Sequence, residues 1–295
     1  MKKFLSVTLS FVITGAVLVS GYALEEKLGE YKKEYDIKVS TTTEMRDGRT
    51  VDFEKLKAKN PDVKGWIWLP GTNIDYPIVQ GKDNDYYLHR DLEGNYLYDG
   101  CIFIDAAVEE PFSSNENTVI YGHHMRSGAM FHDLSRYARE EDFMEENDTI
   151  IIETEDGSYD MKVIAYCNED ADSKLYTTYF EPPEQYEIYP AEEPVFTKRY
   201  FAALVRDKAR KASDVTFGED DRIVTLSTCT ASSGEGRHQI IGVLRPAAMK
   251  DVVKKEKIST VNKWHALQIA VAVVMIITVL SFLISVVKAI RGNRR

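Results

Sequence analysis

Cysteine is scarce in this sequence, with three in 295 residues. The three are far apart and form no CxxC pair, which excludes a disulfide-dense scaffold and a zinc site built from paired cysteines. Basic residues are not in excess either: 37 Lys and Arg stand against 47 Asp and Glu, a formal net charge of −10. That balance argues against a protein whose main function is to bind nucleic acid. Apolar residues make up 44% of the chain, which is enough for a packed core.

Two long apolar runs lie near the ends of the chain. Residues 4–24 and 266–287 carry no charge, and a helix of about 20 apolar residues crosses the apolar core of a bilayer. The second run follows Trp264 and precedes a basic cluster, so we expect a transmembrane helix there. The first run follows two lysines and has two interpretations, a signal peptide cleaved after Ala23 or an uncleaved membrane anchor.

The charges beside these runs predict the topology. Positive flanks stay at the cytoplasmic face, so the region between the runs is expected outside the cytoplasm. Six of the 37 basic residues lie in the two flanks, so region 25–265 keeps 31 basic residues against all 47 acidic ones, a net charge of −16. We therefore expect an acidic extracellular domain tethered to the cell membrane, with its acidic residues solvating the surface.

The region between the runs has the pattern of many short strands with helices between them. This pattern predicts a mainly β protein with a closed β-barrel and inserted helices. Strands are expected near residues 65–69, 74–79, 101–104, 117–121, 150–154, 159–166, 222–228 and 239–244, and helices near 51–60, 130–141 and 195–211. The predicted organisation is a signal peptide or anchor (1–24), a stalk with N-terminal helices (25–60), a barrel domain (61–250), a juxtamembrane linker (251–265), a transmembrane helix (266–287) and a basic cytoplasmic tail (288–295).

Two strand-like stretches end in side chains that can do chemistry. Residues 225–229 read TLSTC, with Arg237 eight residues after the cysteine, and residues 121–124 read YGHH. A Cys nucleophile needs a proton-transfer partner, usually His, and the oxyanion formed by attack on a carbonyl needs hydrogen-bond donors such as a guanidinium. Cys229, a histidine and Arg237 would therefore suffice for acyl transfer. The alternative for Cys229 is a small buried apolar side chain.

These motifs resemble those of the sortase family, class B in particular. The similarity covers GWIWLPGTNIDYPIVQ, DNDYYLHRDL, GCIFID, NTVIYGHHM, MFHDLSRY, TLSTC and GRHQIIGVL, in family order. The resemblance implies an eight-stranded β-barrel and an extracellular cysteine transpeptidase of Gram-positive bacteria. It implies Cys229 as nucleophile, His123 as acid/base and Arg237 as the oxyanion or substrate-positioning group. Because adjacent strand residues point to opposite faces, His124 is then a neighbour with no catalytic role.

Two residues beside the nucleophile are candidates for supporting roles. Ser227 lies two residues before Cys229 on the same face and would hydrogen-bond substrate or Arg237, with core filling as the alternative. Thr228 leads into Cys229 and is a candidate for oxyanion support. We expect no cofactor and no metal, because no carboxylate pattern accompanies the nearby histidines. The other cysteines, Cys101 and Cys167, are expected as buried thiols, with a disulfide between them as the alternative.

The predicted reaction is transpeptidation at the membrane. The enzyme would cleave a C-terminal sorting motif of a secreted protein after a Thr, hold the acyl group on Cys229 and transfer it to an amine. Partners would be pilins or surface proteins bearing a sorting signal, and the amine would come from a pilin Lys or a peptidoglycan precursor. A C-terminal anchor departs from class B and is typical of pilus-type sortases, although the lid motif of class C is missing. The alternatives are a cysteine protease that hydrolyses the thioester and an inactive surface-binding module.

Overall fold

The computed structural model describes residues 12, 14–26, 29, 42–43, 50–113, 116–181, 196–229, 236–247 and 260–291. The chain divides into two compact units. One comprises Thr41–Lys255, and the other combines Met1–Ser40 with Glu256–Arg295.

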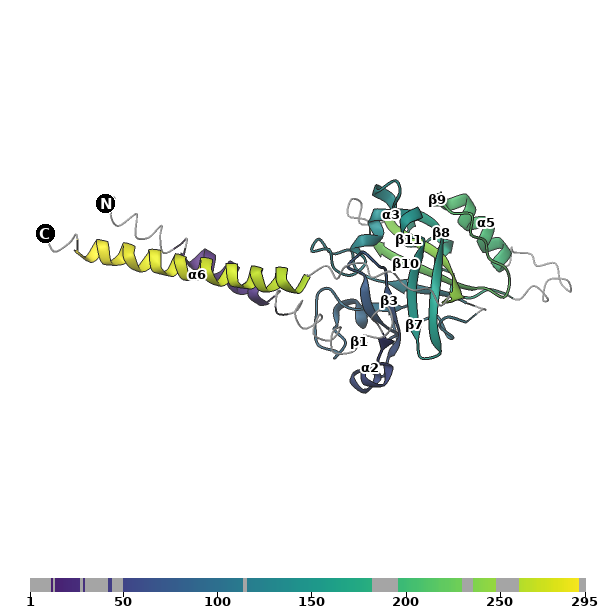
Figure 1. Cartoon of the computed structure of the whole chain (residues 1–295), viewed down its shortest axis with the longest axis horizontal. Coiled ribbons are helices and arrows are strands. Elements are labelled where there is room, and N and C mark those ends of the chain that lie inside the picture. Colours follow the sequence, from purple (N-terminus) through teal and green to yellow (C-terminus); the bar gives the residue numbers. More distant parts are fainter. Residues whose placement is uncertain are drawn as a thin grey trace. The chain divides into compact units, whose positions relative to one another are not determined.

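The larger unit is a closed, mixed β-barrel (Figure 1). Eight strands pair in the order β11-β10-β6-β5-β4-β3-β7-β8, and pairing of β11 with β8 closes the ring. The pairs β10–β6 and β4–β5 are parallel and the other pairs are antiparallel. The barrel strands are β3 (Val63–Trp68), β4 (Asp75–Val79), β5 (Ile102–Ile104), β6 (Asn117–Tyr121), β7 (Thr149–Thr154), β8 (Gly157–Asp170), β10 (Arg222–Cys229) and β11 (Gly236–Pro246). The predicted closed eight-stranded barrel is therefore confirmed.

Among the described residues, three further strands lie outside this ring. The short strand β9 (Ala209–Ala212) pairs with β8 and extends the sheet beyond the predicted eight. A two-stranded sheet of β1 (Thr42–Thr43) and β2 (Thr50–Val51) precedes the barrel.

Short helices connect the strands. The predicted helix 51–60 is α2 (Phe53–Lys59), and Asp52 caps it by accepting a hydrogen bond from the backbone N–H of Lys55. The predicted helix 130–141 is shorter than expected and consists of η2 (His132–Ser135) followed by α3 (Arg136–Arg139). The remaining helices of this unit are η1 (Tyr87–His89), α4 (Phe143–Glu146), η3 (Lys174–Tyr176) and α5 (Lys198–Lys208).

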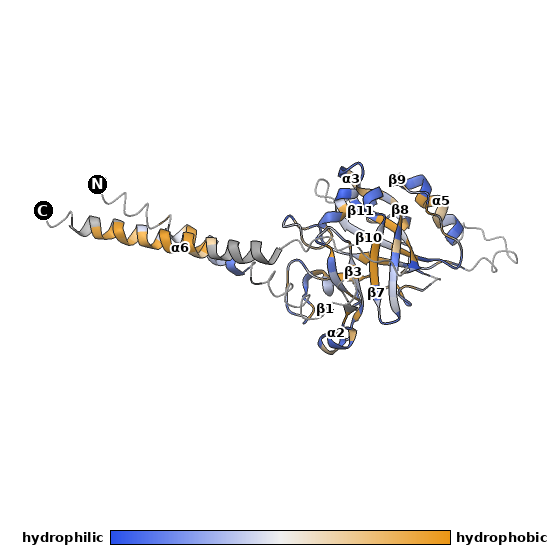
Figure 2. Ribbon diagram, viewed as in Figure 1, coloured by the Kyte–Doolittle hydropathy of each residue, from blue (hydrophilic) through white to orange (hydrophobic). Residues whose placement is uncertain are grey.

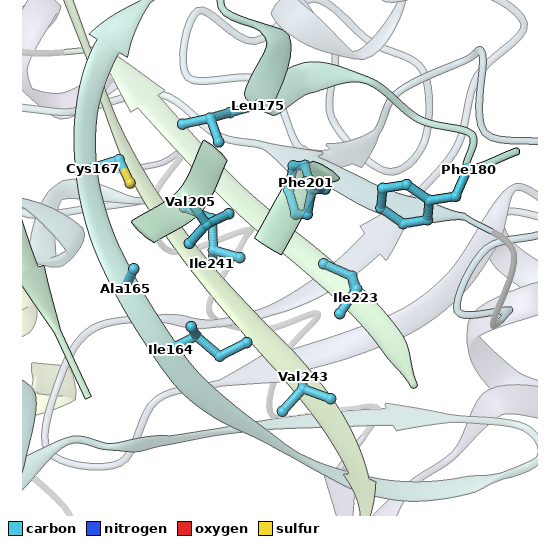
Figure 3. Packing of buried hydrophobic residues seen from close by; sticks show 10 residues of the cluster. All are labelled: Ile164, Ala165, Cys167, Leu175, Phe180, Phe201, Val205, Ile223, Ile241 and Val243. Carbon is cyan, nitrogen blue, oxygen red and sulfur yellow. The ribbon is translucent and has the colours of Figure 1, made fainter. Parts of the chain in front are cut away.

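The helix α5 covers part of the outer face of the barrel. Its Phe201 and Val205 are buried against Ile223 of β10 and Ile241 of β11 (Figure 3). Figure 2 shows the two sides of this packing, with hydrophobic residues on the barrel strands and a mixed hydrophobic and hydrophilic α5. The expected helix 195–211 is wrong at its C-terminal end, because the chain leaves the helix at Ala209 and continues as β9. The local sequence pattern of residues 209–212 cannot show this change from helix to strand, because β9 is stabilised by pairing with the distant β8.

The smaller unit contains the terminal segments. The helix α6 (Thr260–Arg291) includes the predicted segment 266–287. Residues 14–26 are also helical, within the first apolar run. In the described part of the chain, no helix combines the length and apolar character that a membrane crossing needs. The two predicted membrane segments stay predictions.

Candidate active site

Three adjacent strands bring the candidate residues together. The antiparallel register of β10 and β11 places Cys229 opposite Arg237 and Ser227 opposite Gln239. The parallel register of β10 and β6 places Ser227 beside Tyr121. Directly paired residues point to the same face of a sheet and side chains alternate along a strand. These five positions therefore share one face.

That face is the outer one. Ile223 and Ile241 lie on the same side of the two strands and pack under Phe201 and Val205 of α5. The positions of Cys229 and Arg237 lie further along these strands, at the C-terminal end of β10 and the N-terminal end of β11. The alternate positions, such as Leu226 and Ile240, are fully buried in the barrel interior.

His123 reaches this region from the end of β6. The backbone N–H of Gly122 donates to the carbonyl oxygen of Ser227 at 3.1 Å, so the chain still follows β10 one residue before the histidine. His123 Nε2 lies 2.9 Å from the carbonyl oxygen of Leu88. A carbonyl only accepts, so Nε2 carries a hydrogen and Nδ1 is the basic nitrogen of the neutral ring. Burial lowers the pKa of His123, which keeps the imidazole neutral at neutral pH.

The second histidine has different surroundings. The ring of His124 lies 4.5 Å from that of His132 and 6.3 Å from that of His238. His238 alternates with Arg237 on β11 and therefore faces the barrel interior. The ring of His123 instead lies 5.5 Å from that of His89. The two adjacent histidines thus lie on different faces, as the alternation of side chains along a strand predicts.

Arg237 is half-buried near Tyr121. Its guanidinium donates to the carbonyl oxygen of Gly236 at 3.2 Å. Burial raises the pKa of Tyr121, and Asp105, whose carboxylate accepts from the phenol at 2.8 Å, raises it further. The charge of Arg237 acts in the opposite direction on the same phenol, which places the guanidinium within electrostatic reach.

The two candidates for supporting roles lie on different faces of β10, Ser227 on the outer face and Thr228 on the interior face. Ser227 Oγ lies 2.7 Å from the phenolic oxygen of Tyr176, and Gln239 Nε2 donates to the same oxygen at 2.9 Å. Thr228 pairs with His238 on the interior side, where its buried hydroxyl has no hydrogen-bond partner within the described residues. The sequence reasoning missed Tyr176 and Gln239. Alternation with Arg237 was a usable signal for Gln239, whereas nothing in the sequence links Tyr176 to β10.

The other two cysteines are unsuited to nucleophilic attack. Cys101 and Cys167 are both buried and are not joined by a disulfide. Burial raises the pKa of Cys167 to about 12, so its thiolate is scarce at neutral pH. Within the ranges that the structure covers, no group of three or more His, Cys, Asp or Glu side chains is arranged to hold a metal ion.

Comparison with known proteins identifies the family of the chain. The sequence model of the sortase domain matches residues 67–246. The chain belongs to the sortase family. It is 32% identical to sortase B of Listeria monocytogenes over 255 residues, which cover 83% of this chain and 98% of the relative. It is 31% identical to sortase B of Staphylococcus aureus over 83% of this chain and 97% of the relative.

Solved structures agree with the sequence relatives. The Staphylococcus aureus sortase B–substrate complex matches with a TM-score of 0.57 and 29% identity, over 77% of this chain and 95% of that one. Spy0129, a Streptococcus pyogenes class B sortase involved in pilus biogenesis, matches with a TM-score of 0.54 and 30% identity, over 66% and 98%. The chain is therefore a class B sortase, and sortases are cysteine transpeptidases.

Proposed function

We propose that Cys229 is the nucleophile of this transpeptidase, with His123 as acid/base and Arg237 as the donor for the oxyanion. The observation that carries the proposal is the register of β10, which aligns Cys229 with Arg237 on one side and leads to Gly122 and His123 on the other. This arrangement supports the proposal that the nucleophile, the base and the oxyanion donor lie close together on the outer face.

The proposed reaction has two acyl-transfer steps. The Cys229 thiol gives its proton to His123 Nδ1, and the thiolate attacks the scissile carbonyl of the sorting motif. The tetrahedral oxyanion forms beside the Arg237 guanidinium, a planar group with several N–H donors. The C–N bond breaks, the leaving amine takes the proton from His123, and a thioester remains on Cys229. An acceptor amine then attacks the thioester, loses a proton to His123 and releases the sulfur.

Ser227 and Thr228 are proposed to support the site in different ways. Ser227 lies on the face of Cys229 and is tied to Tyr176. Thr228 contributes through its backbone next to the nucleophile, since its side chain is directed to the interior. Among the described residues the buried Thr228 hydroxyl has no hydrogen-bond partner, which fits a role in packing and backbone position.

The natural substrates are proposed to be secreted proteins with a C-terminal sorting signal. The structural match to a class B sortase involved in pilus biogenesis supports a pilin Lys as acceptor, and a peptidoglycan cross-bridge is the second candidate. We also propose that the catalytic domain lies outside the cell and is held at the cell membrane. The two uncharged terminal runs and their basic flanks support this location.

The experiment is capture of the acyl-enzyme. A library of internally quenched peptides, with Thr fixed at the cleaved position and the three preceding residues randomised, is incubated with the full chain, and the most rapidly cleaved member becomes the reporter peptide. Mass spectrometry should find the acyl group on Cys229, and Cys229→Ala should abolish both cleavage and adduct. An adduct on Cys101 or Cys167 would refute the assignment. Added amines, triglycine for a cross-bridge and a Lys-containing pilin segment, should convert hydrolysis into transfer. Hydrolysis alone with every amine would favour the protease alternative.

A further inference from the structure

The carbonyl oxygen of Leu88 contacts the proposed acid/base, 2.9 Å from His123 Nε2. Leu88 is the middle residue of the short 3-10 helix η1, which ends where Arg90 adopts extended backbone. In a longer 3-10 helix the N–H of Asp91 would bind this carbonyl, but it donates to the carbonyl oxygen of Asn95 at 2.9 Å instead. The end of η1 thus leaves the Leu88 carbonyl available to the histidine.

The chain after η1, residues 91–101, turns back and binds the helix on both sides of this carbonyl; we call it the returning segment. The N–H of Cys101 donates to the carbonyl oxygen of Tyr87 at 3.0 Å. The N–H of Leu97 donates to the carbonyl oxygen of His89 at 3.1 Å. These are the carbonyls immediately before and after the one that contacts the acid/base, so the peptide group between them is held in one orientation.

Gly100 of the returning segment lies directly against η1. Its φ of +60° is in the left-handed region, which glycine adopts without the strain that a side chain brings. A Cβ at this position would overlap the carbonyl oxygen of Leu88 and would lie 2.5 Å from that of Tyr87. The N–H of Gly100 donates to the carbonyl oxygen of Leu97 at 3.1 Å, which holds the residue in this position. A larger residue would therefore displace the acceptor of His123.

We propose that Gly100 is a positioning residue of the active site, which keeps the Leu88 carbonyl on His123 Nε2 and so keeps Nδ1 as the basic nitrogen. A neutral imidazole carries one hydrogen and can hold it on either nitrogen. An acceptor fixed beside Nε2 selects the tautomer in which Nδ1 takes the proton of the Cys229 thiol. If the carbonyl moves, part of the enzyme holds the hydrogen on Nδ1, which then cannot act as the base. This inference rests on the proposed role of His123.

The same carbonyl affects the charge state of His123. Burial lowers the pKa of His123, and the hydrogen bond to Leu88 raises it, because a carbonyl accepts more strongly from the imidazolium than from the neutral ring. Further titratable groups near the ring are His89, which lowers this pKa, Asp99, which raises it, and Tyr98, whose ring lies 6.3 Å away. Displacing the carbonyl while these groups stay in the chain should lower the pKa of His123 further.

Gly100→Ala tests the role of this glycine. The added methyl group should displace the Leu88 carbonyl from His123. The kcat for the reporter peptide should fall about ten- to a hundredfold, because the base is misplaced and partly in the wrong tautomer. KM should change little, because the substitution acts on the base and not on a contact with the peptide.

A spectroscopic measurement separates positioning from general damage to the fold. In the full chain labelled with ¹⁵N-histidine, NMR distinguishes the protonated from the unprotonated imidazole nitrogen, and the signals of His123 are assigned by their absence in His123→Gln. The wild type should hold the hydrogen on Nε2. Gly100→Ala should show both tautomers, and its titration should give a lower pKa for His123 than in the wild type.

Gly94→Ala is the matched control. Gly94 belongs to the same returning segment and also has left-handed backbone, with a φ of +81°. The described atom that a Cβ would meet there is the hydroxyl oxygen of Tyr86, at 3.2 Å, and not the carbonyl of Leu88. Both substitutions strain the backbone, but Gly94→Ala leaves the acceptor in place. It should lower the urea midpoint and keep the kcat, the tautomer and the pKa of His123 as in the wild type.

Three results would overturn the proposal. The first is a wild-type His123 with its hydrogen on Nδ1. The second is a Gly100→Ala enzyme with a kcat within twofold of wild type or with unchanged His123 signals. If Gly100→Ala folds poorly, Gly100→Asn replaces it, because Asn adopts left-handed backbone more readily and carries the same Cβ. The third result is that neither variant folds, which would show that position 100 acts on the whole fold.

Failure of the proposed function would look different. The acyl-enzyme on Cys229 and the loss of activity in His123→Ala are measured in chains that keep Gly100. The tautomer of His123 is read without any turnover. An active His123→Ala enzyme would therefore refute the proposed acid/base, whereas an unchanged tautomer in Gly100→Ala would refute only the positioning role of the glycine.

Discussion

Acid should destabilise the barrel through a buried histidine next to the catalytic strands. His238 is 9% exposed, its Nδ1 lies 2.9 Å from the Tyr166 hydroxyl, and burial, together with nearby His124 and Arg139, lowers its pKa to about 4. An unfolded chain has a histidine pKa of about 6.5. The folded state therefore binds a proton less readily than the unfolded state.

The sign and size of the effect follow from this difference. Neutral His238 contributes stability that is fully present above pH 6.5 and is lost as the pH falls from 6.5 through 4. Between pH 7 and pH 5 the loss from this one group is about 2 kcal/mol, and at pH 4 it reaches about 3 kcal/mol. The pKa of His124 is lowered as well, mainly by burial, so the wild type should lose at least this much.

Urea unfolding of the full chain at pH 7 and pH 5, followed by tryptophan fluorescence, measures the effect. Buried Trp66 reports loss of the barrel core. Gln at position 238 can still hydrogen-bond Tyr166 but does not titrate, so His238→Gln should lose about 2 kcal/mol less than wild type between the two pH values. The half-buried His89 lies beside His123, away from His238, and supplies the control His89→Gln, which should follow the wild type. Equal losses in His238→Gln and wild type would refute the reasoning.

Three further predictions concern His123, Arg237 and Gly122 and are checked with the reporter peptide or by urea unfolding. His123→Ala should lower kcat/KM by about 10²- to 10⁴-fold, because general acid–base catalysis is lost, whereas His124→Ala should keep most activity; the reverse order would show that the wrong histidine was chosen. Arg237→Lys should lose about tenfold or more despite keeping the charge, because the planar fork of donors is gone, and near-full activity would contradict the oxyanion role. Gly122→Ala should destabilise the fold by about 1–3 kcal/mol, because an added Cβ would lie 2.8 Å from the Phe131 ring; an unchanged urea midpoint would mean that the ring moves aside at no cost.

The sequence predicts the strands of the barrel well because their signals are local. The alternation of apolar residues and the turn at Gly157 suffice for the hairpin of β7 and β8, and the prediction of residues 117–121 coincides with β6. The motifs TLSTC and YGHH lie at the ends of β10 and β6, where the strand pattern predicts them. What local patterns cannot supply is the parallel pairing of β6 with β10, because these strands are about a hundred residues apart in the chain.

The missed elements share one physical cause. The strand β9 has a mixed and exposed sequence, and only its pairing with β8 makes it a strand. Tyr176 likewise belongs to a short 3-10 helix. Its hydrogen bonds are made with Ser227 and Gln239, which lie more than fifty residues further along the chain. Interactions with distant strands leave no pattern in the sequence of the segment itself. The predicted membrane segments and the roles of Cys229, His123 and Arg237 stay predictions for the experiments above.

Arg237 also helps to fix the register that pairs it with Cys229. If β11 slipped by one residue against β10, Cys229 would face His238, and Arg237 would enter the barrel interior. Burying a guanidinium without a partner is far more costly than burying a neutral imidazole, which the interior already accommodates beside Tyr166. The same slip would expose Ile240, which is fully buried. The positive charge of Arg237 therefore disfavours the slipped register, in which Cys229 and Arg237 would no longer share a face.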